Sequence, residues 1–451
     1  MWRLEDVLKA VQGTPLKVKR DEFAAISTDS RTIKEGDLFI PLVGPNFDGH
    51  TFVRDAYKKS NAGSLCQKGK ETKCLRGGGT LILVEDTTRA LLDLARYKRK
   101  QLTATFVAIT GSNGKTTTKE LLVHMMSGLD IAYNDKNYNN QVGVSHAILS
   151  ISGQPACCIL ELGTNHHGEI AVLAELVEPD FSIITNINAS HLEGLGDLDG
   201  VLREKLSLFE GTKKGGTILI NIDDPMLKDV AANPMRRAYT YAMKRHAAFM
   251  LSIDKDNGLE GFDVALSLRS EVVRTTTRLL GIHNLYNVLA AAAIASAVGV
   301  PKETIAEKVA TFEPYPGRFK ALKAKKGYTV IDDSYNANPA SMEWAITTLE
   351  KLPCKGRRIA ILGGMKELGY QKAYYHKELG RLLKKSGLSA VMFLGKETKG
   401  AFTEMNDIRA KFFDDKSALI AHVAGMVKKQ DIILVKGSRA MKMNEIVKEL
   451  A

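Results

Sequence analysis

The stretch Ile109–Leu122, ITGSNGKTTTKELL, decides how this chain of 451 residues folds. An apolar run enters a loop with two glycines, and Lys115, Thr116 and a helical segment follow. Backbone N–H groups in such a loop can bind phosphate oxygens, the lysine can reach the terminal phosphates, and the Thr116 hydroxyl can ligate Mg²⁺. We therefore predict a nucleoside triphosphate site. Its residues are Gly111, Ser112, Asn113, Gly114, Lys115, Thr116 and Thr117.

This loop departs from the strict P-loop pattern at one position. The first glycine of that pattern would fall at position 109, which is isoleucine, so the loop is tighter on its strand side. A chance glycine turn before a helix is the alternative, but the preceding strand and the placement of Lys115 and Thr116 favour phosphate binding. A P-loop alone does not choose among motors, kinases and ligases.

Outward from the loop, short apolar runs begin near residues 105, 157, 181 and 216. Continuous apolarity predicts strands buried on both faces, as in a parallel sheet covered by helices. Between residues 261 and 280 the period changes to two, which predicts an antiparallel hairpin at the edge of the domain. An alanine-rich helix over residues 283–298 follows.

A proline-rich stretch, FEPYPGR at Phe312–Arg318, predicts a linker, because proline stops helix propagation. Further strands are expected near residues 328, 358, 390 and 431. The length favours more than one hydrophobic core. We predict three α/β domains: a small mixed N-terminal domain (1–100), a central P-loop ATPase-like domain with a parallel sheet (101–314), and a Rossmann-like C-terminal domain (315–451).

Composition narrows the function classes. The longest apolar stretch, around Val288–Val300, is mostly alanine and too short for a bilayer, and MWRLEDVLKA lacks a signal-peptide core, so we expect a cytoplasmic protein without membrane insertion. We also expect a monomer. Five cysteines without C-x-x-C spacing predict reduced, mostly buried thiols. The net charge of +12 comes from scattered lysines, which favours a solvated basic surface, suited to a small polyanionic substrate, over nucleic-acid binding.

Further motifs occur in an order that resembles the Mur ligase family over almost the whole chain. They are TDSRTIKEGDLFIPLVG from Thr28, GSNGKTTTKE, YNNQVGV from Tyr138, LELG, HLEGLGDLDGV from His191, GIHNLYN, PGR and DDSYNANP. GGMKELG from Gly363 and LVKGSRAMKM from Leu434 look like the branch that adds D-alanyl-D-alanine. The DNPR pattern of the branch that adds a diamino acid is absent.

The resemblance implies two Mg²⁺ ions. Glu161 and Thr116 would hold the ion of the nucleotide, and His191 would help to hold a second. A carbamylated Lys205 would be a further ligand of the second ion. Taken alone, a strand-end glutamate is more often a cap, a single histidine a loop or core residue, and Lys205 a solvated helix face.

For ATP, the resemblance implies contacts of Asn284 with adenine, Arg318 with the γ-phosphate, and Asp333 with ribose or phosphate. The planar fork of arginine suits phosphate. The alternative roles are a helix-start cap for Asn284, a salt bridge in the linker for Arg318 and a turn for Asp333. Because Arg318 and Asp333 follow the linker, a complete site requires closure of the C-terminal domain.

For the second substrate, the resemblance implies a uridine-diphosphate pocket and contacts to the muramoyl peptide. The pocket would include Asp29, Ser30 and Arg31, and the peptide contacts would come from Asn139 and Asn140. Adjacent asparagines are otherwise ordinary turn residues.

The implied activity is ligation of D-alanyl-D-alanine to UDP-N-acetylmuramoyl-tripeptide, with ATP consumed and Lys115, His191 and Lys205 as the catalytic groups. The alternatives are a sister ligase or a folylpolyglutamate synthase. Less favoured are a nucleic-acid-associated P-loop ATPase and an idle binding protein.

Overall fold

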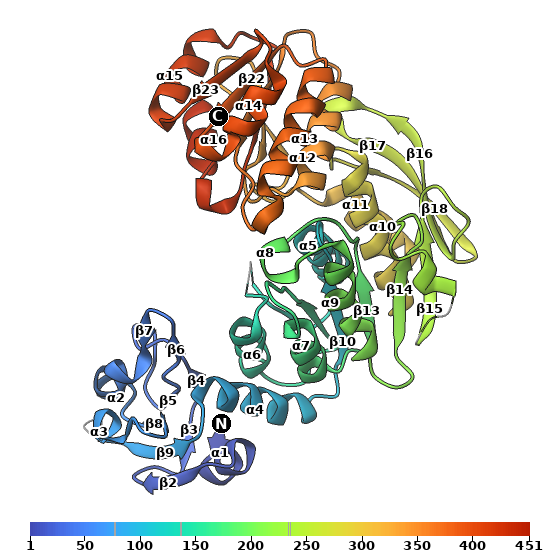
Figure 1. Cartoon of the computed structure of the whole chain (residues 1–451). Helices are drawn as coiled ribbons and strands as arrows, with labels where there is room; N and C mark the ends of the chain where they lie inside the picture. Colours follow the sequence, from blue (N-terminus) through green and yellow to red (C-terminus); the bar gives the residue numbers. More distant parts are fainter. Residues whose placement is uncertain (76–77, 136–137, 233, 235) are drawn as a thin grey trace. The chain divides into compact units, whose positions relative to one another are not determined.

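In the computed structural model the chain forms alternating helices and strands (Figure 1), and residues 1–75, 78–135, 138–232, 234 and 236–451 are described. Contacts group these residues into two compact units. The first unit comprises Met1–Val107, Asp130–Leu162 and Val172–Pro179. The second unit comprises Ala108–Leu129, Gly163–Ala171 and Asp180–Ala451. Strand β10 (Thr105–Thr110) leads into the glycine-rich loop, and the boundary between the two units falls in the middle of this strand, after Val107.

The first unit contains a five-stranded sheet in the order β2-β9-β8-β5-β4, parallel except for the antiparallel β2–β9 pair. Its strands are β2 (Thr14–Lys17), β4 (Ile26–Ser27), β5 (Leu38–Phe39), β8 (Gly63–Gln67) and β9 (Thr80–Val84). Alternate residues of a strand face opposite sides of a sheet. Accordingly Leu65 and Ile82 belong to one buried cluster, whereas Cys66 and Leu81 belong to another.

Helices cover both faces of this sheet. Helices α1 (Leu4–Val11) and α4 (Thr87–Lys100) pack on the Leu65 side, and α2 (Val53–Ser60) and α3 (Glu71–Cys74) pack on the Cys66 side. The first unit also holds the parallel strands β11 (Ile131–Tyr133) and β12 (Cys157–Glu161), with α6 (Gln141–Leu149) between them in the chain. The predicted mixed α/β character of the N-terminal part is confirmed.

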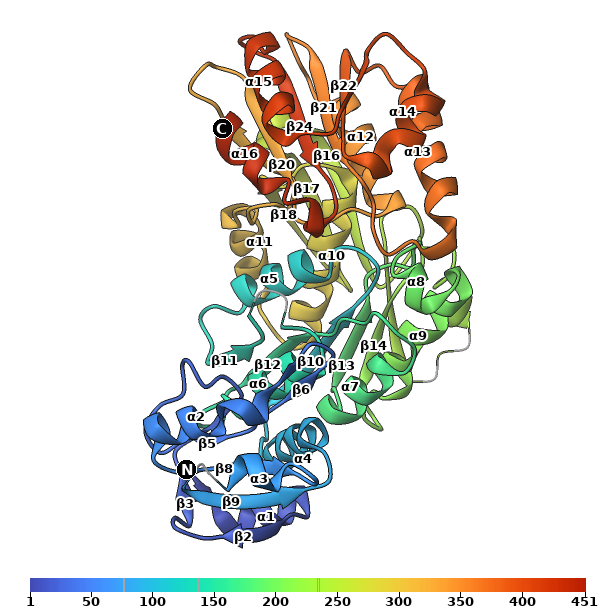
Figure 2. The ribbon, with the colours of Figure 1, turned by 60° about the vertical axis from the view of Figure 1, so that its left-hand side comes forward.

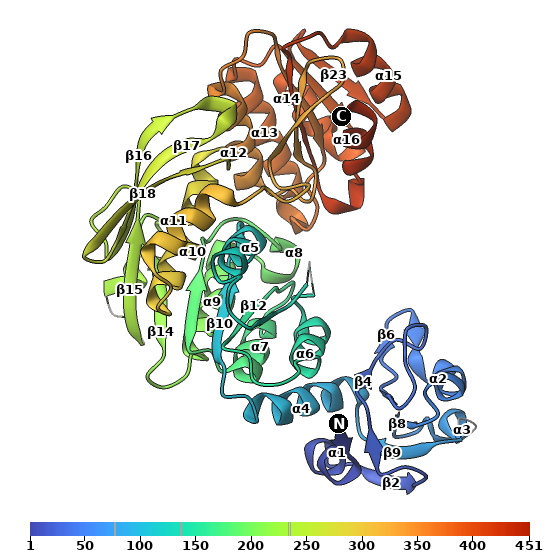
Figure 3. The ribbon, with the colours of Figure 1, turned by 180° about the vertical axis from the view of Figure 1, so that it is seen from behind.

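The second unit begins with a mixed sheet and its helices. From β13 to β16 the strands are parallel, whereas β16–β17 and β17–β18 are antiparallel, and β18 is the edge. These strands are β13 (Phe181–Ile184), β14 (Thr217–Asn221), β15 (Arg237–Ala242), β16 (Phe249–Asp256), β17 (Phe262–Leu268) and β18 (Glu271–Thr277). Figure 3 shows β16–β18 as one extended antiparallel ribbon. The predicted edge hairpin is therefore confirmed, and β15 and β16 are strands that the sequence analysis did not identify.

Two helices of this unit support the glycine-rich loop. The loop ends where α5 (Lys115–Met125) begins, and α10 (Ile282–Ala297) packs beside α5. Helix α10 is the predicted alanine-rich helix, and its alanines 290–293 are buried, which permits a close approach of its neighbours. Helix α11 (Lys302–Thr311) follows and ends directly before the predicted proline-rich linker.

After the linker, the chain builds a six-stranded sheet in the order β19-β20-β24-β21-β22-β23, parallel except for β19. The strands are β19 (Lys320–Lys323), β20 (Thr329–Asp333), β21 (Arg358–Gly363), β22 (Ala390–Leu394), β23 (Ala410–Phe413) and β24 (Ile432–Lys436). The four strands expected from residues 328 to 431 are thus present.

Both faces of this C-terminal sheet are buried. The helices α12 (Pro339–Lys351), α13 (Lys372–Lys385) and α14 (Lys399–Met405) cover one face, and α15 (Lys416–Met426) and α16 (Asn444–Leu450) cover the other (Figure 2). This burial explains the continuous apolar runs of the strands. Contacts place this sheet in the same unit as the glycine-rich loop, although it is a separate sheet.

No helix among the described residues combines the length and the apolar character needed to span a bilayer.

Candidate functional site

The two glycines of the loop are required by close neighbours. Gly111 has φ +148°, and a Cβ there would lie 1.9 Å from Thr185 Oγ1. Gly114 has φ +81°, and a Cβ there would lie 2.1 Å from Asn287 Oδ1 on α10. A side chain at either position would collide with these groups, and at Gly114 it would also force a left-handed conformation. The backbone therefore takes a path that only glycine permits.

Backbone and side-chain groups of the residues that follow β13 hold the loop in shape. The Ser112 amide donates to Asn186 O (2.9 Å), and the Asn113 amide donates to Asn186 Oδ1 (3.1 Å). The Ser112 hydroxyl donates to Asn188 O (2.8 Å), and the Thr185 hydroxyl donates to Asn113 O (2.6 Å). The loop is thus ordered by the protein itself, as a preformed phosphate site requires.

Helix α5 begins directly after the loop, at Lys115. The first helical hydrogen bond of α5 runs from the Thr118 amide to Gly114 O (2.9 Å). The amides of Lys115, Thr116 and Thr117 lie before this bond, in the first turn. The Lys115 ammonium donates to Gly111 O (2.7 Å) and lies across the loop. The seven loop residues predicted from the sequence lie together before and within the first turn of α5, and their role at a phosphate stays a prediction.

Arg318, at the end of the linker, and Asn338, beyond it, reach this loop. Arg318 Nη2 donates to Thr116 Oγ1 (3.0 Å), and its guanidinium lies over the ring of Tyr335, 3.8 Å from the ring centre. Asn338 Nδ2 donates to Asn113 Oδ1 (2.8 Å), while the Asn338 side chain also caps α12. The predicted proximity of Arg318 to the loop is present, and Asn338 is a contact that the sequence analysis missed.

Asn284 and Asp333, the other predicted nucleotide contacts, also lie in the second unit. Asn284 is buried in the first turn of α10, where its Nδ2 donates to Leu280 O (3.0 Å) and its Oδ1 accepts from Asn287 Nδ2 (3.0 Å). Asp333 ends β20 and accepts from Lys436 Nζ at 2.6 Å. The Asn287 side chain donates to Asn284 and also lies next to Gly114. Asn284 is therefore linked to the glycine-rich loop through the side chain of Asn287.

Lys205 is buried rather than solvated. It lies on α9 (Leu198–Glu210) with 1% of its surface exposed. Burial lowers the pKa of its ammonium well below the ordinary value, and the nearby charge of Lys115 lowers it further. The neighbouring Glu204 is also buried, but it accepts from Gly168 N (2.6 Å) and Ile170 N (2.8 Å). The solvated helix face is therefore wrong for Lys205, and the amine can be neutral.

His191 faces a carboxylate that had no assigned role. Its Nδ1 lies 2.7 Å from Glu367 Oε2, in the GGMKELG stretch. Burial lowers the pKa of His191, with further lowering from the charges of Lys115 and Lys205, while Glu367 opposes the shift. His191, Lys205, Lys115 and Glu367 therefore form one electrostatically coupled group in the second unit.

Glu161 lies in the first unit, at the end of β12, with 2% of its surface exposed. Asn139 Nδ2 donates to its Oε1 (2.8 Å), and Asn134 bonds its backbone at both N and O. Among the described residues its Oε2 has no hydrogen-bond partner. A buried carboxylate oxygen without a donor fits a metal ligand.

The remaining predicted substrate residues also lie in the first unit. Asn140 caps α6 through a bond from Gly143 N (2.9 Å) to its Oδ1. Arg31 binds Asp29 through Nε (2.9 Å) and Nη2 (2.7 Å), and this pairing lowers the pKa of Asp29 to about 2. Lys59 Nζ donates to Ser30 O (3.0 Å). Asp29, Ser30 and Arg31 thus form one local turn with an exposed guanidinium.

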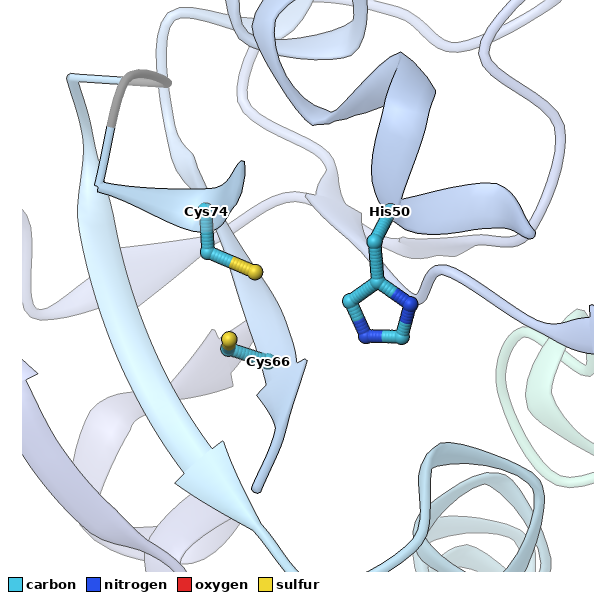
Figure 4. Close-up of side chains that lie close together, drawn as sticks. All are labelled: His50, Cys66 and Cys74. Carbon is cyan, nitrogen blue, oxygen red and sulfur yellow. The ribbon is translucent and has the colours of Figure 1, made fainter. Parts of the chain in front are cut away.

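A separate cluster of possible metal ligands lies in the core of the first unit. His50, Cys66 and Cys74 have ligand atoms within 4.8 Å of one another (Figure 4). However, His50 Nδ1 lies 2.7 Å from Asp48 Oδ1, and its Nε2 accepts from Gln67 N (3.0 Å), so both nitrogens have partners. Both thiols belong to an apolar cluster. We interpret these groups as core residues, in agreement with the predicted buried, reduced cysteines.

Glu367, Asn338 and Lys436 are the site residues that the sequence analysis did not identify as such. Each lies in a motif quoted above: Lys436 ends β24, and Glu367 and Asn338 lie in the segments that follow β21 and β20. In a parallel sheet, the carboxyl ends of strands are where ligands bind. Polar residues at the ends of the predicted C-terminal strands were therefore the available signal.

Comparison with family models gives two matches. The Mur ligase middle domain matches residues 109–295, and the Mur ligase glutamate ligase domain matches residues 317–439. The gap between the two matches, residues 296–316, contains α11 and most of the proline-rich linker at Phe312–Arg318.

Relatives match over nearly the full chain. The UDP-N-acetylmuramoyl-tripeptide–D-alanyl-D-alanine ligases of Bacillus subtilis (31% identical; 99% of this chain, 98% of the relative) and Escherichia coli (32%; 99% and 97%) are two of them. Among solved structures, MurF of Acinetobacter baumannii has a TM-score of 0.89 at 27% identity (100% and 98% coverage). MurF of Thermotoga maritima in complex with ADP has a TM-score of 0.84 at 25% identity (94% and 96% coverage).

Proposed function

Because the chain belongs to the Mur ligase family, with its three-domain α/β fold, we propose that it joins D-alanyl-D-alanine to UDP-N-acetylmuramoyl-tripeptide. ATP is converted to ADP and phosphate, and the product is the pentapeptide precursor of peptidoglycan. The observation that carries this proposal is the similarity along almost the whole chain to ligases of this name. The chain is accordingly an ADP-forming peptide ligase.

The domain roles follow the predicted bounds. Residues 1–100 bind the uridine-diphosphate end of the substrate, residues 101–314 bind ATP, and residues 315–451 bind the dipeptide and close on ATP. The contacts of Arg318 and Asn338 with the loop support a role of the C-terminal part at the nucleotide. We place the enzyme in the cytoplasm as a monomer.

The reaction has two steps. A terminal carboxylate oxygen of the tripeptide attacks the γ-phosphorus of ATP, the bond to the β-γ bridging oxygen breaks, and ADP leaves. The amine of D-alanyl-D-alanine then attacks the acyl carbon of the resulting acyl phosphate, loses a proton, and expels inorganic phosphate. Activation is necessary because a carboxylate is unreactive toward an amine at neutral pH. Lys115, Arg318 and the loop amides stabilise the charge on the phosphoryl group in transfer.

The nucleotide contacts extend from the loop to α10 and β20. Gly111 to Thr117 surround the phosphates, Asn284 contacts adenine, and Asp333 contacts ribose or phosphate. In the first unit, Asp29, Ser30 and Arg31 contact the uridine diphosphate, and Asn139 and Asn140 contact the muramoyl peptide. The exposed Arg31 guanidinium, next to Asp29, supports the first of these assignments.

We propose that two Mg²⁺ ions bind. Thr116 and Glu161 would hold the ion of the nucleotide, and the Glu161 Oε2 that lacks a protein donor supports this role. His191 and Lys205 would hold the second. When bound, these ions neutralise phosphate charge.

Lys205 would act as a carbamate. A neutral amine adds to carbon dioxide, forms the N–C bond and releases one proton, which leaves an anionic oxygen donor in place of a cation. The burial of Lys205 supports this assignment because it favours the neutral amine.

The test is phosphate release by the purified protein with ATP, Mg²⁺, UDP-N-acetylmuramoyl-tripeptide and D-alanyl-D-alanine, with each component omitted in turn. We expect full activity only with all four. Activity with another amino acid or with folates would assign a sister ligase or a folylpolyglutamate synthase instead. Stimulation by nucleic acid without peptide substrates would contradict a ligase.

The intermediate has its own test. With oxygen-18 in the terminal carboxylate of the tripeptide, one labelled oxygen should appear in the released phosphate, because the carboxylate oxygen leaves with phosphorus. Unlabelled phosphate accompanying normal product would exclude the acyl phosphate.

A further inference from the structure

The loop after β21 lies against the loop that carries His191. The Glu193 amide donates to Glu367 O (3.2 Å), and Gln371 Nε2 donates to Gly196 O (3.3 Å). Helix α8 (Leu192–Leu195), which follows His191, packs beside the short helix Gly369–Gln371. These contacts join the two loops independently of the side chains of His191 and Glu367.

Both facing residues have a left-handed backbone. Glu367 has φ +62° and His191 has φ +53°, conformations that non-glycine residues adopt at a cost. This conformation accompanies the 2.7 Å approach of Glu367 Oε2 to His191 Nδ1. Such strain persists where the surrounding structure holds it, and it is concentrated at functional sites.

The surrounding structure does hold the Glu367 loop. The Met365 amide donates to the ring of His376 (3.2 Å), and the Lys366 amide donates to Ser438 Oγ (2.8 Å). His376 is itself fixed by Lys372 O, 2.8 Å from its other nitrogen. The carboxylate of Glu367 is thus presented from a rigid support, as an orienting group requires.

We propose that Glu367 is a positioning residue for His191, whose carboxylate fixes the imidazole through Nδ1 and leaves Nε2 as the nitrogen for a metal ion. This inference rests on the proposed function, in which His191 holds the second Mg²⁺. Histidine ligands of metals typically donate their other ring N–H to a carboxylate, which sets the tautomer and the ring orientation. In this chain Glu367 Oε2 lies 2.7 Å from His191 Nδ1 as an ion pair; the contact lacks the alignment of a hydrogen bond, so the carboxylate acts on the ring through its position and charge.

The two partners come from different sides of the linker. His191 follows β13, whereas Glu367 follows β21 in the C-terminal part. The orientation of the metal ligand thus depends on the docking of the C-terminal part onto the P-loop part. Glu367 couples domain docking to assembly of the metal site.

The test combines metal binding with kinetics in Glu367→Gln and Glu367→Ala. Mn²⁺ is the probe, titrated by electron paramagnetic resonance with a non-hydrolysable ATP analogue and UDP-N-acetylmuramoyl-tripeptide present. We expect two sites in the wild type and a loss of about 10- to 100-fold in affinity at one site in both variants. The kcat should fall while KM for ATP changes less than about threefold, because that residue acts through His191. Glu193→Gln, an exposed carboxylate in the facing loop, is the matched control.

A double variant decides whether Glu367 acts through His191. If it does, adding Glu367→Ala to His191→Ala should cost little further rate, since residues acting as a unit are not additive. Additive losses, or wild-type affinity for both Mn²⁺ ions in the Glu367 variants, would overturn the inference. The wild type is assayed for ligation in parallel. If the wild type ligates and the Glu367 variants behave like it, only the role of Glu367 fails; if the wild type does not ligate, the proposed function fails.

Discussion

Lys115 on the glycine-rich loop and Lys205 on α9 differ in what surrounds the same functional group. The Lys115 ammonium has a backbone acceptor 2.7 Å away, Gly111 O, within its own loop. Lys205 has 1% exposure and lies near the positive charge of Lys115, so its pKa is well below the ordinary value. The first lysine is therefore suited to phosphate as a cation, and the second to chemistry that begins from a neutral amine. The fold, rather than the residue type, assigns these roles.

The largest expected effect concerns Lys115. Lys115→Ala should lower ligation by at least about 100-fold, because a donor to the transferring phosphoryl group is lost. The protein should remain folded, since the ammonium donates to the loop backbone at Gly111 O. Ligation rates and circular dichroism measure both parts, with Lys214→Ala, an exposed lysine of the same unit, as the control. Activity near the wild-type level would remove Lys115 from the site.

The second prediction tests the other side of the comparison. Lys205→Ala should lose about 100-fold or more in ligation but keep its nucleotide affinity within about threefold, because the glycine-rich loop is unchanged. Formate or acetate, which supply a carboxylate to the emptied space, should restore part of the rate. Lys205→Arg should not respond, because it fills that space with a permanent cation.

A direct observation accompanies this prediction. Wild-type protein equilibrated with carbon-13 bicarbonate should show one carbamate signal by nuclear magnetic resonance, and Lys205→Ala should lack it. Wild-type turnover in Lys205→Ala, or no carbamate signal in the active wild type, would refute the proposed ligand.

The third prediction separates the two reasons for glycine in the loop. Gly114→Ala combines a left-handed φ with a collision on Asn287 Oδ1, whereas Gly215→Ala has a similar φ (+87°) and nothing within 4 Å. We expect Gly215→Ala to lose about 1 kcal/mol of unfolding free energy and Gly114→Ala about 2 to 3 kcal/mol. Denaturant unfolding measures both. Equal losses would show that the contact with α10 does not shape the loop.

The smallest effect concerns His283, another base with a lowered pKa. Burial lowers its pKa to about 4, and its ring stacks on Trp344 with ring centres 5.8 Å apart. In the unfolded chain the imidazole takes up a proton near pH 6.5, but in the folded chain only near pH 4, so stability falls as the pH drops through this interval. The imidazole keeps some contact with solvent, so we expect about 1 to 2 kcal/mol at pH 5.

The measurement compares the wild type with His283→Phe, which preserves an aromatic ring but cannot titrate. The loss of unfolding free energy between pH 7 and pH 5 should be smaller in the variant by that amount. Identical pH dependence in both proteins would show that His283 titrates normally in the folded chain.

The sequence predicted those parts of the molecule whose causes lie close together in the chain. The spacing of glycines and the periodicity of apolar residues predicted the glycine-rich loop, the buried parallel strands, the edge hairpin and the alanine-rich helix. All of these elements are present. Strands β15, β16 and β23 were missed because partly exposed strands lack a strong period.

The site was predictable only in part. The position of Lys205 on a helix with charged neighbours indicated a solvated face, and only the family resemblance suggested otherwise. Its burial comes from residues distant in the chain, and so does the pairing of Glu367 with His191. Neither arises from local pattern, because tertiary packing sets both the electrostatic environment and the partner.

The bonds from Asn186, Asn188 and Thr185 to the glycine-rich loop have a consequence for binding entropy. Ordering a backbone residue costs about 1 to 2 kcal/mol, so fixing Gly111 to Gly114 corresponds to about 4 to 8 kcal/mol. In this chain the folding reaction carries that cost, before any nucleotide arrives. The affinity for triphosphate is therefore not reduced by loop ordering, and variants that cut these bonds would transfer the cost from folding to binding.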